Sequence, residues 1–460
     1  MLVMKFGGTS VQDSAAINQA VKIISARRDR SPVVVVSAMA GVTDALLSMA
    51  SFARERRFDD AASIIDAVRR RHLTTARELL NQAPEHSFYL AAQGIEENLK
   101  ELEGLALSVA TLGELTPRTQ DAMVSFGERL SSALVAAALD AHGVAAQLVD
   151  SRDFIVTDDR FTSATPDFPQ TAARVRKALF PSIKSGVVPV AQGFIGSTKE
   201  GVTTTIGRGG SDYSAAIIGA ALGADAIEIW TDVDGLMTAD PRVVPEALRI
   251  RVISFAEASE LSYFGAKVLH PSTVLPAVER TIPIHIYNTQ NPDCEGTLIV
   301  AAPKPSRNVI KSIAFKRSVT IVNVASTRML LAYGFLRTIF EVFERHQTSI
   351  DVVTTSEVSV SMTLDNADQL EAIKRDLGGI GEVSVERDKA IVCVVGDNLK
   401  FTSGVAARLF RAIEHTNVNM ISQGASEINL TFVIDDSDAE LVVRSLHQEF
   451  FSEADPEVFA

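Results

Sequence analysis

The sequence predicts an α/β protein in which a layered domain with a mainly parallel sheet is followed by two smaller α+β units. Two observations predict the first domain. Apolar, β-branched runs without alternation, such as VVVV at 33–36, are typical of strands buried on both faces. They alternate with segments of helical periodicity over the first 300 residues, which is the pattern of a parallel sheet covered by helices. The third observation is an internal repeat in the remaining residues, which predicts the two smaller units.

The chain opens with a predicted strand, a glycine turn, a helix and a second strand. The strand is LVMKF at 2–6 and the turn is GGTS, and the helix at 15–26 carries Ile17, Val21 and Ile24 on one face. Residues 45–112 are rich in Ala, Leu, Arg and Glu at helical spacing. We therefore expect a helical excursion there, folded as an antiparallel hairpin on the flank of the sheet.

The alternation of strands and helices resumes after Pro117. We expect helices near 121–142, 213–222 and 255–264, and strands within 187–196, 226–233 and 282–288. The stretch AAPKPSRN at 301–308 holds two prolines and little apolar content, which is typical of a linker. The sequence therefore predicts a first domain over 1–300 and a linker over 301–312.

Two repeat units, over 313–387 and 388–460, follow the linker. At an offset of 70 residues Gly334 aligns with Gly404, VTIVNV (319–324) resembles AIVCVV (390–395), and VSVSMTL (358–364) resembles INLTFVI (428–434). Each unit reads as strand, helix, strand, strand, helix. The alternating strands need cover on one face, which two such units packed together would supply.

Composition and charge exclude several classes of function. The 44 Lys and Arg against 57 Asp and Glu give a net charge of −13, which argues against nucleic acid binding but leaves room for a small anionic ligand in a locally positive pocket. Cys294 and Cys393 are too few for a disulfide framework, and no CxxC or HExxH string indicates zinc. The start of the chain does not read as a signal peptide, and no apolar run reaches the ~18 residues of a membrane span. We expect a soluble, cytoplasmic protein without a membrane partner.

Two glycine clusters suggest sites for anions. The turn after Lys5 lets backbone amides approach an anion at a helix start, although a plain tight turn is the simpler alternative. In TTTIGRGGSD (203–212), Arg208 among three glycines is poorly suited to packing but well suited to gripping a carboxylate or phosphate in a bidentate manner. Asp212 could simply cap the following helix.

Other polar residues suggest a ligand-binding site only in combination with their neighbours in the sequence. The loop TDVDGLMTADPR (231–242) follows a strand, where open α/β sheets bind ligands. Ser37 and Thr43 follow the buried strand, with turn formation and capping as the alternative. Glu128 lies in an apolar helix, and its alternative to a site role is an exposed ion pair. For Lys267 the alternative is a solvated surface charge.

Six motifs, in their order and spacing, resemble those of aspartokinases: KFGGTSV, SAMAGVT, SFGERLS, GFIG…TTTIGRGGSDYSAA, WTDVDG…TADPR and FGAKVLHP. The repeat units resemble the paired ACT regulatory modules of that family, so the resemblance covers essentially the whole chain. It implies an amino acid kinase fold, an αβα sandwich around a mainly parallel sheet, followed by two ferredoxin-like ACT modules.

The same resemblance implies the reaction. The γ-phosphoryl group of MgATP would pass to the β-carboxylate of L-aspartate, giving 4-phospho-L-aspartate for the synthesis of lysine, threonine, methionine and diaminopimelate. A carboxylate nucleophile is already ionised at neutral pH, so no general base is needed. ATP is the co-substrate, and Mg²⁺ would be bound mainly through its phosphates, so the resemblance implies no dedicated metal site in the protein.

The resemblance assigns roles to matching positions. The catalytic set would be Lys5, Gly7, Gly8 and Asp212, with Lys5 and the two glycine amides stabilising the transferring group. Arg208 would clamp the α-carboxylate of aspartate while Glu128, and with it Asp212, faces the ammonium. Aspartate-binding positions would be Ser37, Thr43, Glu128, Arg208 and Ser211. ATP-binding positions would be Lys5, Thr231, Asp232, Met237, Arg242 and Lys267.

In the first repeat unit, nine residues match positions that bind feedback amino acids in lysine-sensitive members: Met329, Gly334, Phe335, Leu336, Ser349, Asp351, Thr355, Ser356 and Glu357. Asp351 could receive an effector's ammonium, whereas its repeat partner is Ile421. We therefore expect inhibition by lysine through the first unit and a homodimer or higher homo-oligomer formed through both. Threonine, or lysine and threonine in concert, remain open as effectors, and so does a role of both units as assembly surfaces only.

Three other functions are alternatives to this hypothesis. A sister kinase acting on glutamate, acetylglutamate or a nucleotide would typically lack the SFGERLS segment and the paired ACT units. A non-catalytic amino acid sensor is disfavoured by the presence of Lys5, Arg208, Asp212 and Lys267. A fusion to homoserine dehydrogenase is disfavoured because no nucleotide-binding βαβ unit follows the repeats up to Ala460.

Overall fold

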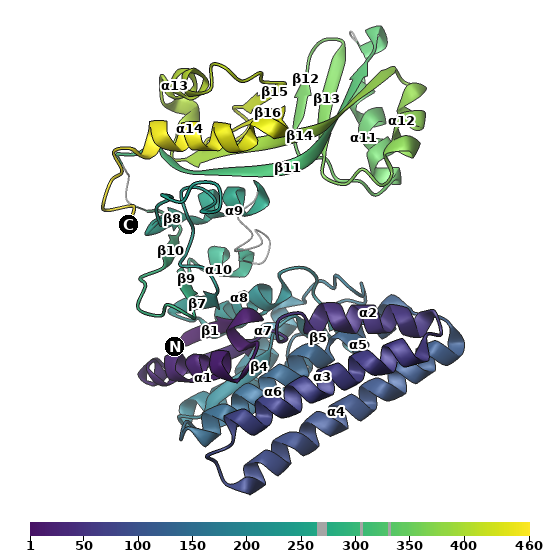
Figure 1. Ribbon diagram of the computed structural model, residues 1–460, viewed down its shortest axis with the longest axis vertical. Helices are drawn as coiled ribbons and strands as arrows, with labels where there is room; N and C mark the ends of the chain where they lie inside the picture. The colour runs from purple at the N-terminus through teal and green to yellow at the C-terminus, as the bar shows by residue number, and fades with distance from the viewer. Residues whose placement is uncertain (265–273, 304–306, 330–332) are drawn as a thin grey trace. The chain divides into compact units, whose positions relative to one another are not determined.

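The structure, a computed structural model, describes residues 1–264, 274–303, 307–329 and 333–460. The chain folds into two compact units (Figure 1). The first comprises Met1–Leu236, Val252–Phe255 and Val268–Ala302. The second comprises Met237–Arg251, Ala256–Lys267 and Pro303–Ala460. Segments that precede the linker in the sequence therefore belong to both units.

The first unit is built on an eight-stranded sheet. In spatial order its strands are β3 (Ala146–Val149), β4 (Val188–Gln192), β2 (Pro32–Val36), β1 (Leu2–Phe6), β7 (Ala226–Thr231), β9 (Ile284–Asn288), β10 (Thr297–Val300) and β8 (Val252–Ser254). Every neighbouring pair is parallel except β9 with β10. The expected mainly parallel sheet is confirmed. The fully buried β1 lies between β2 and β7, which places its carboxyl end between theirs.

Helices cover both faces of this sheet. On one face, Leu2, Met4 and Phe6 share a core with α1 (Ser14–Ser25) and α6 (Phe126–Ala141). On the other face, α8 (Gly210–Leu222) lies so close that a Cβ on Gly219 would sit 2.9 Å from Ile227 Cδ1. The helices α7 (Phe168–Lys184) and α10 (Leu275–Glu279) pack against α8. The predicted αβα sandwich is confirmed.

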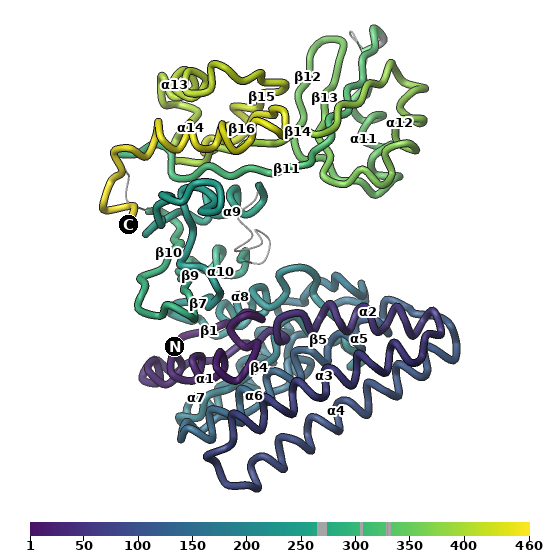
Figure 2. Tube along the Cα trace, in the orientation of Figure 1, coloured from purple at the N-terminus to yellow at the C-terminus, as the bar shows by residue number. Residues whose placement is uncertain are grey.

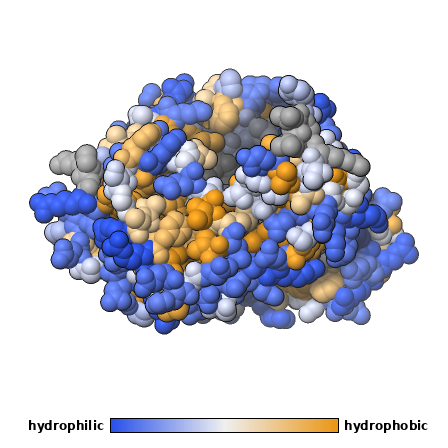
Figure 3. All heavy atoms as spheres, turned by 90° about the horizontal axis from the view of Figure 1, so that it is seen from above, coloured by the Kyte–Doolittle hydropathy of each residue, from blue (hydrophilic) through white to orange (hydrophobic). Residues whose placement is uncertain are grey.

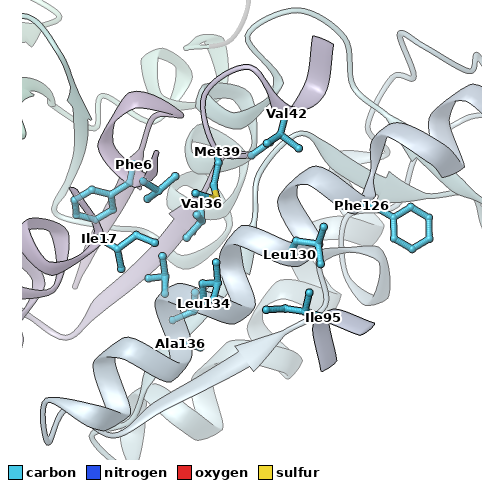
Figure 4. Close-up of a cluster of buried hydrophobic side chains, with 14 of the residues drawn as sticks. Phe6, Ile17, Val36, Met39, Val42, Ile95, Phe126, Leu130, Leu134 and Ala136 are labelled. Carbon is cyan, nitrogen blue, oxygen red and sulfur yellow. The ribbon is translucent and has the colours of Figure 1, made fainter. Parts of the chain in front are cut away.

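The helical excursion consists of α2 (Val42–Arg54), α3 (Phe58–Leu79) and α4 (Glu85–Leu112). Helices α3 and α4 contact each other and run side by side, in the hairpin that the sequence predicts (Figure 2). The excursion is part of the main core, because its apolar residues join the same buried cluster as α1 and α6. Figure 4 shows Ile95 of α4 beside Leu130 and Leu134 of α6.

The helix predicted over 121–142 begins earlier and is interrupted. It consists of α5 (Pro117–Val124) and α6, separated by a turn at Ser125, whose hydroxyl donates to Ala122 O at 2.7 Å. Within the part of the chain that the structure describes, Pro117–Ala141 is the one stretch with the length and apolar character of a membrane span, and 78% of its window is buried inside the fold. Its apolar side chains serve the protein core.

A short antiparallel ribbon stands apart from the large sheet. It pairs β5 (Ile195–Ser197) with β6 (Thr203–Thr205). The chain leaves β6 through a glycine turn at 207–209 and enters α8 directly.

The second unit holds a six-stranded antiparallel sheet. In spatial order its strands are β12 (Val353–Thr355), β13 (Ser359–Leu364), β11 (Ile310–Ala325), β14 (Glu382–Gly396), β16 (Asn429–Asp435) and β15 (Met420–Gln423). Its helices are α11 (Phe335–Arg345), α12 (Leu370–Gly378), α13 (Val405–Ala412) and α14 (Ala439–Phe451). Both repeats show the predicted order of strand, helix, strand, strand, helix. Pairing of β11 with β14 joins them, and residues 310–312 of the predicted linker lie in β11.

Helix α9 (Phe255–Phe264) precedes the linker in the sequence, yet nearly all of it belongs to the second unit. Its Glu257 forms an ion pair with Lys311 of β11 at 3.1 Å, and both side chains are only 2% exposed. One turn further, Glu260 accepts a hydrogen bond from Asn429 of β16 at 2.7 Å. One face of α9 is therefore bonded to the six-stranded sheet.

Apolar residues gather on the surface in Figure 3, amid a mostly hydrophilic rim. In the second unit, the described large hydrophobic residues with more than a third of their surface exposed are Tyr263, Tyr333, Leu336, Phe340, Val358, Phe401, Ile421 and Leu441. A surface of this kind is typical of a protein that associates.

Candidate active site

An ion pair joins the two predicted catalytic side chains. Lys5, in the central strand β1, and Asp212, in the first turn of α8, are both buried, and Lys5 Nζ lies 2.7 Å from Asp212 Oδ1. The strand supplies the cation and the helix supplies the carboxylate, so their distance follows from the packing of α8 on β1.

The glycine turn after β1 requires a glycine at position 8. A Cβ on Gly8 would lie 2.9 Å from Ala38 O, so no side chain fits there. The Gly7 N–H donates to Trp230 O at 2.9 Å and is directed into the sheet. Gly8, but not Gly7, lines the neighbouring cavity.

A cavity of about 530 Å³ opens at the carboxyl ends of β1 and β2. Eight of the residues predicted for catalysis or aspartate binding line it together: Lys5, Gly8, Ser37, Thr43, Glu128, Arg208, Ser211 and Asp212. The charged lining residues are mixed in sign, because Asp44 and Asp121 join Glu128 and Asp212 opposite the two cations. The sequence predicted a locally positive pocket, whereas the lining carries charges of both signs. Such a lining suits a zwitterionic dicarboxylate better than a plain anion.

Glu128 is the most perturbed group of this cavity. It is 3% exposed, and its Oε1 accepts the Ala38 N–H at 3.1 Å. Its Oε2 is buried, and no described residue bonds to it. Burial raises the pKa of Glu128 to about 8. A buried carboxylate oxygen at the cavity wall is ready to accept an ammonium group.

Ser37 and Thr43 also line the cavity and are half-buried. Ser37 directly follows β2, and its backbone is fixed at both ends: its N–H donates to Phe6 O at 3.1 Å and its carbonyl accepts from Ser131 Oγ at 2.7 Å. Thr43 lies in the first turn of α2, after Gly41 at a φ of +77°. Both side-chain hydroxyls remain available to a ligand, since no bond to them is seen among the described residues.

Arg208 lies at the tip of the glycine turn between β6 and α8. Gly207 and Gly209 adopt left-handed φ values of +79° and +70°, which a side chain would disfavour. Arg208 itself is exposed, and its guanidinium has no hydrogen-bond or ion-pair partner among the described residues. Next to it, a Cβ on Gly193 would come within 2.6 Å of the Ser211 side chain.

The positions predicted for ATP fall in both units. In the first unit, Thr231 and Asp232 line a separate cavity of about 310 Å³ beside the start of α1. In the second unit, Met237 is half-buried, and Arg242 is exposed and paired with Asp240 at 2.6 Å. Lys267 lies outside the described residues.

Asp351 is the most buried of the acidic groups predicted for effector binding. Its side chain is 4% exposed. Tyr263 of α9 donates to Oδ1 at 2.6 Å, and Lys316 of β11 donates to Oδ2 at 3.3 Å while also pairing with Asp365. Burial, together with Asp365, raises the pKa of Asp351.

The other predicted effector positions surround the first repeat's helix start and its β12–β13 hairpin. Gly334 precedes α11 at a φ of +78°. The half-buried positions are Met329 and Phe335, and the exposed ones are Gly334, Leu336, Ser349, Thr355, Ser356 and Glu357. In the second repeat Ile421 is 48% exposed.

Sequence reasoning missed several residues that line the 530 Å³ cavity, among them Asp44, Gln120, Asp121, Thr162 and Phe194. Asp121 carried a signal, because it precedes Glu128 by seven residues, two helical turns. Thr162 and Phe194 are non-glycine residues at φ values of +72° and +66°, which no sequence pattern announced.

Comparison with known proteins identifies the chain. Residues 1–288 match the amino acid kinase family, and residues 392–450 match an ACT domain. Lysine-sensitive aspartokinase 3 of Escherichia coli is 38% identical over 98% of this chain and 99% of its own length. Crystal structures of E. coli aspartokinase III match with TM-scores of 0.84 for the complex with aspartate and ADP and 0.82 for the complex with lysine and aspartate. Each has 38% identity and covers 98% of this chain, and 100% and 99% of those chains. The predicted resemblance is confirmed: this chain belongs to the aspartokinases, the ATP-dependent kinases that phosphorylate the side-chain carboxylate of aspartate.

Proposed function

We propose that this enzyme binds L-aspartate in the 530 Å³ cavity, with Glu128 at the ammonium and Arg208 at the α-carboxylate. The observation that carries the assignment is the buried Oε2 of Glu128, a lining residue of the cavity, for which no described residue is a partner. Ionising this buried carboxyl without a partner is costly, which its raised pKa reflects, and an ammonium group that pairs with the ionised form removes that cost. Ser37, Thr43 and Ser211 would add hydrogen bonds to the two carboxylates of the substrate.

With the amino acid end held in this way, the β-carboxylate of aspartate would face Lys5 and Gly8. Phosphoryl transfer is mainly positioning and neutralisation of charge on the moving oxygens. Lys5 is held by Asp212, so its ammonium is placed before substrate arrives. We assign the Gly8 amide to the transferring group, while the Gly7 amide, bonded to Trp230 O, serves the turn.

The nucleotide would use Thr231 and Asp232 from the first unit, with Met237, Arg242 and Lys267 as further ATP positions. Mg²⁺ would arrive on the phosphates of ATP and neutralise part of their charge. No cluster of three or more acidic, His or Cys side chains that could hold an ion by itself occurs within the described ranges. Mg²⁺ in general keeps water and substrate phosphate oxygens as most of its ligands.

We further propose that lysine inhibits the enzyme by binding to the first ACT module. The E. coli relative is named as lysine-sensitive and has been crystallised with lysine. In this chain Asp351 supplies a carboxylate for an ammonium group, where the second module has Ile421. The exposed apolar residues of the second unit support a homo-oligomer formed through the modules. A cytoplasmic location is part of the same proposal.

The proposal is tested by ATP-dependent formation of aspartyl hydroxamate in the presence of hydroxylamine, with glutamate as the competing acceptor. Aspartate should be turned over and glutamate should not. The same assay is then titrated with lysine and threonine, separately and together. Inhibition by threonine alone, or only by the two amino acids together, would contradict the assignment of lysine.

A further inference from the structure

We propose that Asp121 is a positioning residue of the aspartate cavity: it fixes the two loops that hold the Arg208 turn in place. The inference rests on the proposed role of Arg208 and adds a residue that does not itself need to touch substrate. Asp121 lies on α5, is 1% exposed, and belongs to the cavity wall.

Both carboxylate oxygens of Asp121 are fully engaged. Oδ2 accepts the N–H of Thr162 at 2.9 Å and the N–H of Thr205 at 2.9 Å. Oδ1 accepts the hydroxyl of Thr205 at 2.7 Å. Each of these donors is neutral, and burial raises the pKa of Asp121 while the three hydrogen bonds oppose that rise. A carboxylate with its oxygens used in this way is suited to hold backbone rather than to bind a ligand.

The two anchored threonines flank the Arg208 turn. Thr205 is the last residue of β6, three residues before Arg208, and its carbonyl accepts the Ala164 N–H at 2.9 Å. Thr162 belongs to the adjoining loop, and its carbonyl would lie 3.6 Å from a Cβ on Gly207. The loop at 158–165 and the turn at 207–209 therefore lie against each other, and Asp121 ties both to α5.

The turn needs such a tie. The β5–β6 ribbon has three residues in each strand, too few to be rigid without support. Arg208 has no described partner that would orient its long side chain, so its direction depends on the backbone beneath it. Holding that backbone in the binding geometry lowers the ordering entropy lost when aspartate binds.

The position distinguishes geometry from charge, because asparagine can replace the aspartate bond for bond. In Asp121→Asn the amide oxygen can accept the N–H groups of Thr162 and Thr205, and the amide NH₂ can donate to the Thr205 hydroxyl, which then accepts. Asp121→Ala instead leaves the Thr162 N–H and the buried N–H and hydroxyl of Thr205 without this partner. Thr205→Val removes the hydroxyl bond alone and retains the size of the side chain.

The experiment is steady-state kinetics on the full-length enzyme, with aspartate and ATP varied separately. We expect Asp121→Ala to raise the KM for aspartate at least about tenfold, with kcat and the KM for ATP within about threefold of wild type. Thr205→Val should raise the KM for aspartate by a smaller factor, and Asp121→Asn should restore it to near the wild-type value. Asp167→Ala is the matched control, because Asp167 also accepts a backbone N–H, from Gln170 at 3.2 Å, but caps α7 and does not line the cavity.

A double-mutant cycle with Arg208→Ala separates this inference from the proposed clamp. If Asp121 acts through Arg208, Asp121→Ala should add little to the aspartate KM of Arg208→Ala. Fully additive effects, or an Asp121→Asn variant as impaired as Asp121→Ala, would overturn the positioning role and leave the clamp intact. An unchanged aspartate KM in Arg208→Ala would overturn the clamp and this inference with it. If Asp121→Ala does not fold, Asp121→Asn and Thr205→Val give the same decision.

Discussion

The proposed role of Glu128 predicts a strong pH dependence of aspartate binding. Because the pKa of Glu128 is raised to about 8 by burial, the carboxyl is mostly protonated at neutral pH before substrate binds. The ammonium of aspartate needs the ionised form, so binding must release the proton, and affinity rises with pH until the group is already ionised.

The size of the effect follows from this pKa. The ionised fraction is about a hundredth at pH 6, about a tenth at pH 7 and half at pH 8. The KM for aspartate should therefore fall about tenfold between pH 6 and 7 and about fivefold more between pH 7 and 8. The assay is the initial rate at saturating MgATP with aspartate varied at each pH.

Glu128→Gln supplies the control, since its amide oxygen can still accept the Ala38 N–H but nothing titrates. Every other titrating group, including those of ATP, is common to both enzymes, so the ratio of the two KM values isolates Glu128. The variant should have a higher KM at pH 8 and a nearly flat profile. Parallel profiles for wild type and variant would refute the reasoning.

The other predictions concern the same residues and the regulatory module. Glu128→Gln should raise Tm relative to wild type at pH 9 but not at pH 5. Folding raises the pKa of Glu128, so the wild-type protein loses stability as the pH rises from the unfolded pKa of this carboxyl through its folded pKa. Equal Tm differences at both pH values would contradict this. Arg208→Ala should lower kcat/KM for aspartate at least about 100-fold, while the exposed Arg160→Ala control, outside the cavity lining, should not. Lys5→Met should lower kcat at saturating substrates at least about 100-fold, and a change confined to KM would argue against its catalytic role. Asp351→Asn should raise the lysine concentration for half-inhibition by about tenfold or more, and an unchanged inhibition curve would show that the effector binds elsewhere.

The fold could be predicted where the pattern is local and regular. The β-branched runs of β1 and β2, the glycine turn between β1 and α1, and the order of elements in each repeat all follow from periodicity over a few residues. The turn between α5 and α6 was missed because Ser125 keeps helical backbone angles and helical bonds to Asp121 and Arg129, so the apolar pattern runs through it unchanged.

The candidate site was predicted in the parts that lie within motifs. Lys5, Glu128 and Arg208 come from three distant segments, and their common cavity could be expected only from the resemblance. The partners of Asp121 lie 41 and 84 residues away in the sequence, and a separation of that kind leaves no trace in local spacing. The same holds for the assignment of α9 to the second unit, which depends on contacts such as Glu257 with Lys311, 54 residues apart.

The position of α9 has a consequence for how the chain responds to cleavage. A protease that cut within 301–308 would break the backbone, but the amino-terminal fragment would still carry Glu257 and Glu260, whose partners Lys311 and Asn429 lie in the other fragment. The two fragments should stay associated until denaturant separates them, because removing Lys311 from a fully buried ion pair is strongly destabilising. An ACT pair transplanted from a relative would likewise need a matching α9, so the exchangeable part of this enzyme begins well before its linker.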